Sequence, residues 1–235
     1  MAKQSIVCNY SDVDHVSDTD FSIGYLDNVR FLDGIKKQKQ ASFALMQMRE
    51  GTHVLDVGCG TGDDVCEMAR QVGKSGKAIG VDNSQLMINE ARKRSEDLNL
   101  PVEYYVGDAL HLGFPDTTFD ACRADRVFQH LESPQQALAE MIRVTRSGAH
   151  LVVSDCDWGT LAIASRDIAL TRKITDFYCN GPCNGLIGRM LYSLFKQAGL
   201  LDVTVTPYTF TQNDLAIADQ MVGIRKTVAL AQQNQ

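Results

Sequence analysis

Residues 55–62 read LDVGCGTG, an apolar run that passes directly into a loop containing three glycines. The run His53–Val57 is typical of a buried strand, and Asp63–Val72 after the loop has the pattern of a helix. Gly58 and Gly60 allow positive φ and close approach of the backbone to a ligand, and the helix offers unpaired N–H groups. The stretch therefore predicts a ligand site at the end of a buried strand in an α/β fold.

Strand-like and helix-like segments alternate on both sides of this loop. Further strands are expected over Lys77–Val81, Val102–Val106, Phe119–Arg123 and His150–Ser154. Helices are expected over Asp33–Met48, Ser84–Leu98, Pro134–Thr145 and Ile187–Ala198, with Ser84 as an N-cap. Such alternation predicts a doubly wound, mostly parallel α/β sheet covered by helices on both faces.

The C-terminal part of the pattern is less regular. Leu201–Phe210 is expected to be a sixth strand, although Pro207 interrupts it, and Leu215–Gln232 is expected to be helical. A length of 235 residues favours a single domain over 1–235. Within it we expect an N-terminal helical cap over 1–48 and a lid insertion over 155–200.

Composition bounds the partners and the compartment. The net charge is −6 and the pI is about 5.3, without the basic excess that a nucleic-acid surface needs. No stretch approaches the roughly 18 apolar residues of a membrane span, and the N-terminus lacks the apolar core of a secretion signal. Seven scattered cysteines suit a reducing compartment. A cytoplasmic protein acting on a small molecule is therefore expected, with no nucleic-acid or membrane partner and an open oligomeric state.

A metal site is not expected. Cys179 and Cys183 lie close together in a loop rich in glycine and asparagine, but no second pair of ligands at similar spacing accompanies them.

Two acidic residues follow the second and third expected strands. Asp82, in VDNS at 81–84, stands where doubly wound folds place an acid that accepts hydrogen bonds from ribose hydroxyls. An aspartate before a helix can also simply cap it. Asp108, in GDA at 107–109, could accept from an adenine amino group or be a turn residue. Combined with the glycine loop, Asp82 favours a nucleoside ligand.

The glycine spacing distinguishes this loop from a dinucleotide site. In G-x-G-x-x-G the third glycine would stand where Asp63 stands, and here it comes one residue early. Asp56 ends the strand just before the loop, and a carboxylate is poorly matched to a pyrophosphate. It is well matched to a ligand with a cationic amino group and a sulfonium. A purely structural glycine turn is the alternative.

With these motifs the chain resembles the class I S-adenosylmethionine-dependent methyltransferases, in the small-molecule group similar to ubiquinone and menaquinone methyltransferases and natural-product O-methyltransferases. The matching segments are LDVGCGTG at 55–62, VDNSQLM at 81–87, GDALHLGFPDTTFD at 107–120 and LAEMIRVTRSG at 138–148. The resemblance covers about 50–154. It implies a Rossmann-like fold and S-adenosylmethionine as the cofactor, and it does not identify the acceptor.

The resemblance implies binding roles at both ends of the cofactor. At the methionine end, Gly58 and Gly60 would line the cofactor and Asp56 would support its amino group. Arg123 is expected just after the fourth strand, where the backbone of the family meets the cofactor, and Tyr25 would close over this end.

At the adenosine end, the resemblance assigns the ribose to Asp82. The adenine would lie between Asn83 and Met87, and its edge would meet Asp108 and Ala109. The family usually ends in an antiparallel seventh strand, which this sequence lacks unless Tyr208–Thr211 supplies it or the chain stops early.

His130 and Asp155 are the candidate catalytic residues. His130 follows the fourth expected strand and Asp155 ends the fifth, so both should lie at the carboxyl edge where ligands bind in open α/β sheets. We expect His130 to act as the general base of an O-methyl transfer, oriented by Asp155. Alternatively, His130 only packs near the helix beginning at Pro134. N- or C-methylation and a non-catalytic cofactor-binding regulatory protein are the other functions left open.

The loops that would select the acceptor are Ser17–Asp33 and Cys156–Arg189, since specificity in such folds lies in segments added to the core. Ser17–Asp33 and Asn180–Gly185 are also expected to form a mobile cover that excludes water from the site.

Overall fold

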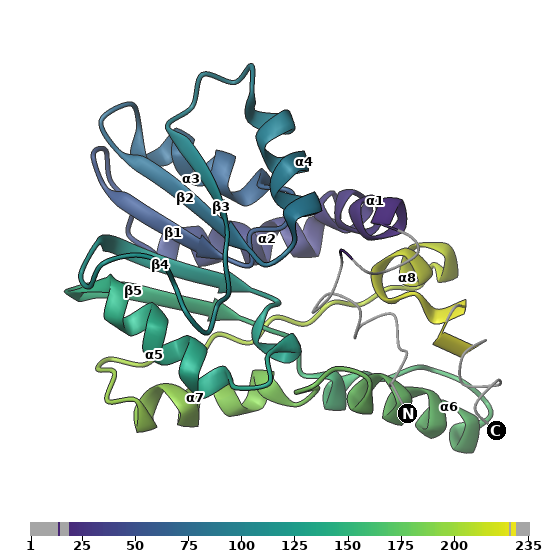
Figure 1. Cartoon of the computed structure of the whole chain (residues 1–235). Coiled ribbons are helices and arrows are strands. Elements are labelled where there is room, and N and C mark those ends of the chain that lie inside the picture. Colours follow the sequence, from purple (N-terminus) through teal and green to yellow (C-terminus); the bar gives the residue numbers. More distant parts are fainter. Residues whose placement is uncertain (1–13, 15–18, 226, 229–235) are drawn as a thin grey trace.

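A five-stranded parallel sheet forms the centre of the computed structural model, which describes residues 14, 19–225 and 227–228 (Figure 1). The order of its strands is β3-β2-β1-β4-β5. Their bounds are β1 (His53–Val57), β2 (Lys77–Asp82), β3 (Val102–Val106), β4 (Phe119–Asp125) and β5 (Thr145–Ser154). The predicted doubly wound parallel sheet is confirmed, and β2, β4 and β5 are longer than expected.

Helices connect the strands and cover the sheet. They are α1 (Thr19–Arg30), α2 (Asp33–Leu45), α3 (Asp63–Val72), α4 (Gln85–Ser95), α5 (Pro134–Val144), α6 (Ile168–Asn180), α7 (Ile187–Gln197) and α8 (Leu215–Val222). Two short 3₁₀ turns are η3 (Phe128–His130) and η4 (Trp158–Thr160). The expected cap of α4 is confirmed, because the Ser84 hydroxyl accepts from the backbone N–H of Met87 at 3.1 Å.

Alternate residues of β1 enter the two hydrophobic layers of the core. Val54 packs with Met68 of α3 in the layer that also includes α2 and α4, and Leu55 packs with Met141 of α5 in the layer that includes α7. Figure 1 shows α5 and α7 together below the sheet. All four side chains are almost fully buried, and burial of each such side chain contributes roughly 1.5–3 kcal/mol. Successive side chains of β1 point to opposite faces of the sheet, and each face therefore buries a set of helices.

The expected sixth strand is wrong. Residues 203–214 have no strand assignment, including the alternative at Tyr208–Thr211, and the segment runs as an irregular connection from α7 to α8 (Figure 1). Pro207 has no N–H to give to a ladder, and Leu201 and Val205 are 84% and 63% exposed. Without a buried face the β-branched pattern does not produce a strand, and β5 is the edge of the sheet in the described part of the chain.

The helical expectations also need correction at three places. The helix expected over 215–232 is interrupted, because α8 ends at Val222 and Gly223 takes a left-handed φ of 62°. Residues 229–232 lie outside the described residues. The expected loops around the site contain α1 and α6, and α6 is capped by Asp167, whose carboxylate accepts from the N–H of Leu170 at 2.9 Å.

In the cap expected over 1–48, the described part consists mainly of α1 and α2, while 1–13 and 15–18 lie outside the described residues. None of the helices in the described part is both long and apolar enough to span a bilayer.

Candidate functional site

The order of the strands places a crevice between β1 and β4. The chain moves outward from β1 through β2 to β3, and then returns to the other side of β1 with β4 and β5. At such a reversal the loops after neighbouring strands part in opposite directions, and ligands bind at the carboxyl ends. The glycine loop follows β1 at this point, and η3 follows β4.

A hollow of about 2730 Å³, which we call the switch-point cleft, includes this edge and continues along β5 to residues 145–149 at the other end of that strand. Its lining includes the glycine loop, Asp82 and Asp108 at one end and Asp125–Val127, Ser154–Trp158 and residues 199–212 toward the other. It is larger than the roughly 300–1,000 Å³ of an ordinary ligand site. The volume is this large because the hollow continues beyond the carboxyl edge along β5.

The glycine loop lies close to the chain that follows β4. Gly58 and Gly60 have φ of 73° and 52°, and a Cβ added at Gly58 would lie 2.3 Å from Val127 Cγ2. The N–H of Gly58 donates to the Val81 carbonyl at 2.7 Å, and the N–H of Gly60 donates to Asp82 Oδ2 at 2.8 Å. The loop is therefore held against the end of β2 in one conformation.

Asp82 ends β2 and faces the glycine loop. Its Oδ2 accepts from Gly60 and its Oδ1 accepts from the N–H of Ser84 at 3.0 Å. Burial raises the pKa of this carboxyl, which the hydrogen bonds from Ser84 and Gly60 oppose. Each carboxylate oxygen can accept more than one hydrogen bond, so Asp82 can still accept from a ligand hydroxyl. The helix cap is Ser84, which leaves Asp82 for another role.

The other residues expected at the adenosine end share the same wall. Asn83, Met87, Asp108 and Ala109 all line the cleft. Met87 is buried, whereas Asp108 is exposed and its Oδ1 accepts from the N–H of Leu110 at 2.9 Å, which makes it a turn residue as well. The ends of β1, β2 and β3 therefore present one surface to a nucleoside, and contact of these residues with adenine stays a prediction.

Tyr25 lies in α1 and lines the cleft. Its hydroxyl donates to the carbonyl of Met221 in α8 at 2.7 Å, and burial raises its pKa. The neighbouring Leu26 lies over the glycine loop, since a Cβ at Gly60 would be 3.4 Å from Leu26 Cδ1. Helix α1 therefore covers the loop and is joined to α8.

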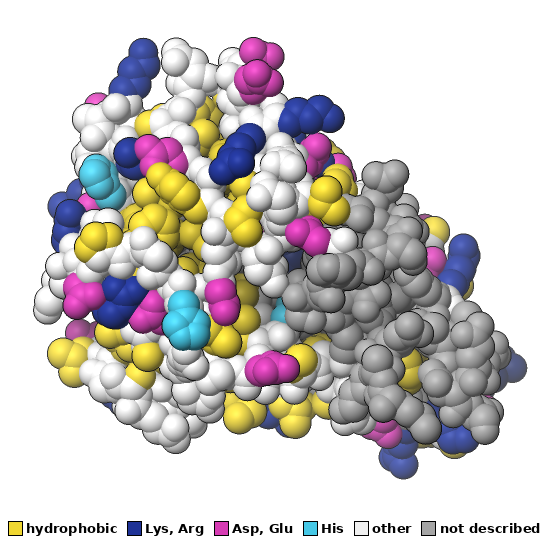
Figure 2. Space-filling model, in the orientation of Figure 1, with side chains coloured by type: hydrophobic (Ala, Val, Ile, Leu, Met, Phe, Trp, Pro, Cys, Tyr) yellow, Lys and Arg dark blue, Asp and Glu magenta, His cyan; other side chains and the backbone are white. Residues whose placement is uncertain are grey.

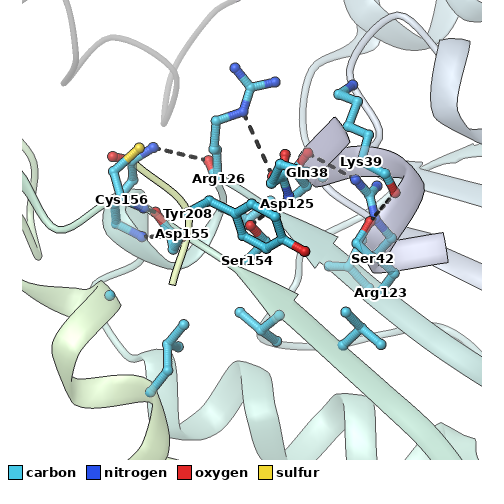
Figure 3. A pocket seen from close by; sticks show the side chains of 18 of the residues that line it. Gln38, Lys39, Ser42, Arg123, Asp125, Arg126, Ser154, Asp155, Cys156 and Tyr208 are labelled. Atoms are coloured by element: carbon cyan, nitrogen blue, oxygen red, sulfur yellow. Dashed lines mark hydrogen bonds and ion pairs between the residues drawn. The ribbon is translucent and has the colours of Figure 1, made fainter. Parts of the chain in front are cut away.

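Arg123 lies inside β4, not after it, and its side chain is 1% exposed. The expectation that it follows the strand is wrong, because β4 continues to Asp125. Its Nη1 is 3.0 Å from Asp56 Oδ1. Figure 3 shows Arg123 beside Ser42. Asp56 was expected to support an amino group of the cofactor, and here its carboxylate pairs with Arg123. Burial raises the pKa of Asp56 despite this cation.

Two further carboxylates complete the pairing of Arg123. Its Nη1 is 3.1 Å from Asp64 Oδ2, its Nη2 is 2.8 Å from Asp125 Oδ2, and its Nε donates to the Ser42 hydroxyl at 3.0 Å. Burial opposes ionisation of Asp64, but Arg123 and Lys39 outweigh it and lower the pKa. We call this set the Arg123 cluster. It connects β1, β4, α2 and α3 beneath the glycine loop.

The two predicted catalytic residues lie in segments that meet at the cleft. Asp155 follows β5, and its oxygens accept from the N–H of Cys156 at 2.8 Å and the N–H of Gln129 in η3 at 3.1 Å. Burial raises the pKa of Asp155 to about 7. Burial and then the charge of Arg126 lower the pKa of His130 to about 4, so its imidazole is neutral at pH 7. The hydrogen bond to Asp155 thus comes from Gln129 in η3, and the contact of His130 with Asp155 and both catalytic roles stay predictions.

Sequence reasoning missed Asp125 and Arg126, which line the cleft beside these residues. Their signal is RADR at 123–126, where charged residues end an apolar strand at the point of reversal. This signal shows that charged residues lie at the end of β4, but it does not show which of them face the cleft.

An aromatic pair fixes the segment after β5. Trp158 stacks on Tyr178 of α6 with ring centroids 5.6 Å apart, and its indole N–H donates to Gln129 Oε1 at 2.7 Å. The Tyr178 hydroxyl donates to the carbonyl of Val222 in α8 at 2.8 Å. The region expected to be a lid is therefore joined both to η3 and to the C-terminal helix.

Comparison with known proteins agrees with this geometry. A model of a methyltransferase domain family matches residues 48–199, more than half of the chain. The chain belongs to this family, and thereby to the class I S-adenosylmethionine-dependent methyltransferases. A solved S-adenosylmethionine-dependent methyltransferase from Aquifex aeolicus is 27% identical with a TM-score of 0.51, over 65% of this chain and 77% of that one.

Two curated relatives cover different extents. An uncharacterized 37.1 kDa protein in transposon TN4556 of Streptomyces fradiae is 40% identical over 214 residues, 89% of this chain and 61% of that protein. A demethylmenaquinone methyltransferase of Listeria welshimeri is 35% identical over 120 residues, 51% of each chain. The chain spans between about half and three fifths of the length of these relatives.

S-adenosylmethionine, the cofactor of this class, fits the residues at the cleft. Gly58 and Gly60 both have positive φ, a Cβ at Gly58 would meet Val127 at 2.3 Å, and Asp82 offers acceptor oxygens one strand away, so this loop can take its bend and close contacts only with glycine at these positions. Asp82 and Asp108 line the cleft outside the Arg123 cluster, and carboxylates suit a ligand with a cationic sulfonium and ammonium.

Proposed function

We propose that this chain transfers the methyl group of S-adenosylmethionine to a small-molecule acceptor. The observation that carries the proposal is the glycine loop fixed to Asp82 at the reversal between β1 and β4. One end of the switch-point cleft then takes the nucleoside. The remainder, toward β4 and β5, is available to an acceptor.

The residues have to orient the acceptor and exclude water. When bound, the cofactor supplies an activated methyl group, whose bond to sulfur breaks with its electrons on sulfur as the acceptor's lone pair forms the new bond. Orientation of the two reactants can supply on the order of 7–11 kcal/mol of the barrier reduction. Helix α1 over the glycine loop and the Trp158–Tyr178 pair beside η3 support a water-excluding cover on both sides of the cleft.

O-methylation is the reaction we favour, with His130 accepting the proton of an acceptor hydroxyl and Asp155 as its orienting residue. A neutral imidazole is the form that can accept a proton. With a pKa of about 4 it is a weak base, so this role suits an acidic hydroxyl such as a phenol or an enol. The Listeria relative, named for demethylmenaquinone, adds quinone-like acceptors to those worth testing.

Surface charge supports a small acceptor over a nucleic acid. The net charge is −6, and on the face shown in Figure 2 the Lys and Arg side chains are dispersed among Asp and Glu. A polyanionic partner would need basic side chains gathered on one face.

The test is an acceptor screen with detection of S-adenosylhomocysteine by mass spectrometry. Phenols, hydroquinones, enols and primary amines would be offered to the purified chain with S-adenosylmethionine. We expect turnover with an acidic hydroxyl and much less with amines. Tight cofactor binding without turnover in any class would instead favour a non-catalytic cofactor-binding protein.

A further inference from the structure

Arg126, one residue beyond β4, has an unusual backbone for a residue in the cleft. Five non-glycine residues of the described chain have positive φ: Gln47, Asn99, Thr117, Arg126 and Asp202. The other four are exposed, whereas Arg126, with φ of 59°, is half-buried. Its N–H donates to the carbonyl of Ser154 at 2.7 Å, which fixes this conformation. Strained backbone of this kind persists where the surroundings hold a side chain in a required position.

The charge of Arg126 is less completely paired than that of Arg123. Asp125 Oδ2 accepts a hydrogen bond from Arg123 Nη2 at 2.8 Å. Asp125 Oδ1 is 3.8 Å from Arg126 Nε, which is beyond hydrogen-bonding distance. Tyr25 is the other neighbour, because the charge of Arg126 and a side-chain hydrogen bond from it both oppose the rise in the pKa of the Tyr25 phenol. A guanidinium has five donors, so Arg126 can take a ligand carboxylate in addition to these neighbours.

Arg126 lies on the β4 side of the cleft. The next residue, Val127, covers Gly58, while Arg126 lies close enough to His130 and Cys156 to act electrostatically on both. In Figure 3 its guanidinium extends away from Ser154 and Tyr208. Asp82 and Asp108 follow β2 and β3, on the opposite side of β1 from β4. The side chain is thus placed beyond the residues that would hold the nucleoside.

We propose that Arg126 binds a carboxylate of the acceptor, so that the substrates of this site are anionic small molecules. The inference rests on the proposed methyl transfer. A planar guanidinium pairs with a planar carboxylate through two parallel hydrogen bonds, which would also fix the direction from which the acceptor enters. A dianionic phosphate fits less well, because Asp125 and Asp155 lie in the same wall.

Calorimetry with matched acids and amides tests the proposal. Benzoate with benzamide, and hexanoate with hexanamide, would be titrated into the protein saturated with S-adenosylhomocysteine. We expect the wild type to prefer an acid of at least one pair, and Arg126→Gln to weaken that acid about tenfold or more while leaving the amide unchanged. Arg126→Lys, which keeps the charge but not the fork, should give an intermediate loss.

Arg70→Gln is the control. Arg70 lies in α3 outside the lining of the cleft, and its guanidinium pairs with Glu67 at 3.2 Å in a half-exposed ion pair. Its removal should leave the preference for the acid within about twofold of wild type.

Two results would overturn the role of Arg126. One is equal binding of acids and amides by the wild type and Arg126→Gln. The other is a tenfold loss of S-adenosylhomocysteine affinity in that variant, which would assign Arg126 to the cofactor. If Arg126→Gln does not fold, Arg126→Lys decides. An unchanged preference of Arg126→Lys for the acid would count against the two parallel hydrogen bonds from the guanidinium. Failure of the wild type to bind S-adenosylhomocysteine would instead reject the proposed methyl transfer.

Discussion

Replacing Asp82 with Ala should weaken cofactor binding in a measurable and limited way. The carboxylate accepts from Gly60 at 2.8 Å and from Ser84 at 3.0 Å, and we expect it to accept from ribose hydroxyls as well. A hydrogen bond to a charged group contributes roughly 1.5–3 kcal/mol, so loss of the ribose contact predicts about a 10- to 150-fold weaker complex. Release of the Gly60 N–H also loosens the glycine loop, which places the result toward the upper end.

Isothermal titration with S-adenosylhomocysteine measures this effect directly. Asp82→Asn is an informative second variant, because an amide has one acceptor oxygen while Gly60 and Ser84 present two donors. We expect it to bind weakly too. Asp97→Ala, which removes an exposed carboxylate just after α4, is the control. An affinity of Asp82→Ala within twofold of wild type, in a folded variant, would refute the assignment of Asp82 to the ribose.

Three further predictions concern the catalytic pair and the cover. His130→Ala should lower turnover of a hydroxyl acceptor by about 10²–10⁴ with unchanged S-adenosylhomocysteine affinity, and a drop under fivefold would reject the base role. Asp155 has a folded pKa of about 7, above its ordinary 3.8, so the stability it contributes is complete below pH 4 and is lost as the pH rises toward 7. The free energy of unfolding of the wild type in urea, relative to that of Asp155→Asn, should therefore fall as the pH rises from about 4 to 7. A pH-independent difference between the two proteins would contradict the raised pKa. Hydrogen exchange in α1 and in Asn180–Gly185 should slow when S-adenosylhomocysteine binds, and unchanged exchange in both would remove the case for a moving cover.

The sequence was sufficient for the sheet because strand burial and glycine placement are local properties. His53–Val57 and Val102–Val106 are strands as expected, and Ser84 caps its helix. The expected strand at Leu201–Phe210 was wrong because β-branched alternation shows only that a segment can pair. Whether it does pair depends on a buried face that the tertiary structure does not provide there.

The sequence predicted which residues lie at the carboxyl ends of the strands, but not which side chains they contact. Asp82 and Asp108 lie where strand ends imply. That Asp56 would pair with Arg123 could not be inferred, since the pairing depends on the register between β1 and β4, in which Asp56 lies opposite Arg123. Arg126 was missed for a similar reason, because its importance comes from its left-handed backbone and its distance from Asp125, which no motif encodes.

The Arg123 cluster determines which part of the cap can open. Helix α2 supplies Ser42 to Arg123 and Lys39 to Asp64, so moving it away would leave buried charges without partners, at a penalty of several kcal/mol. Helix α1 is joined to α3 and α4 through partly exposed ion pairs of Asp27 and Arg30, which water can replace at little free energy, and its Tyr25 hydroxyl is bonded to α8 and not to the sheet. We therefore expect α1 to swing away from the glycine loop when the cofactor enters, about a hinge near Phe31 and Leu32, while α2 remains in place.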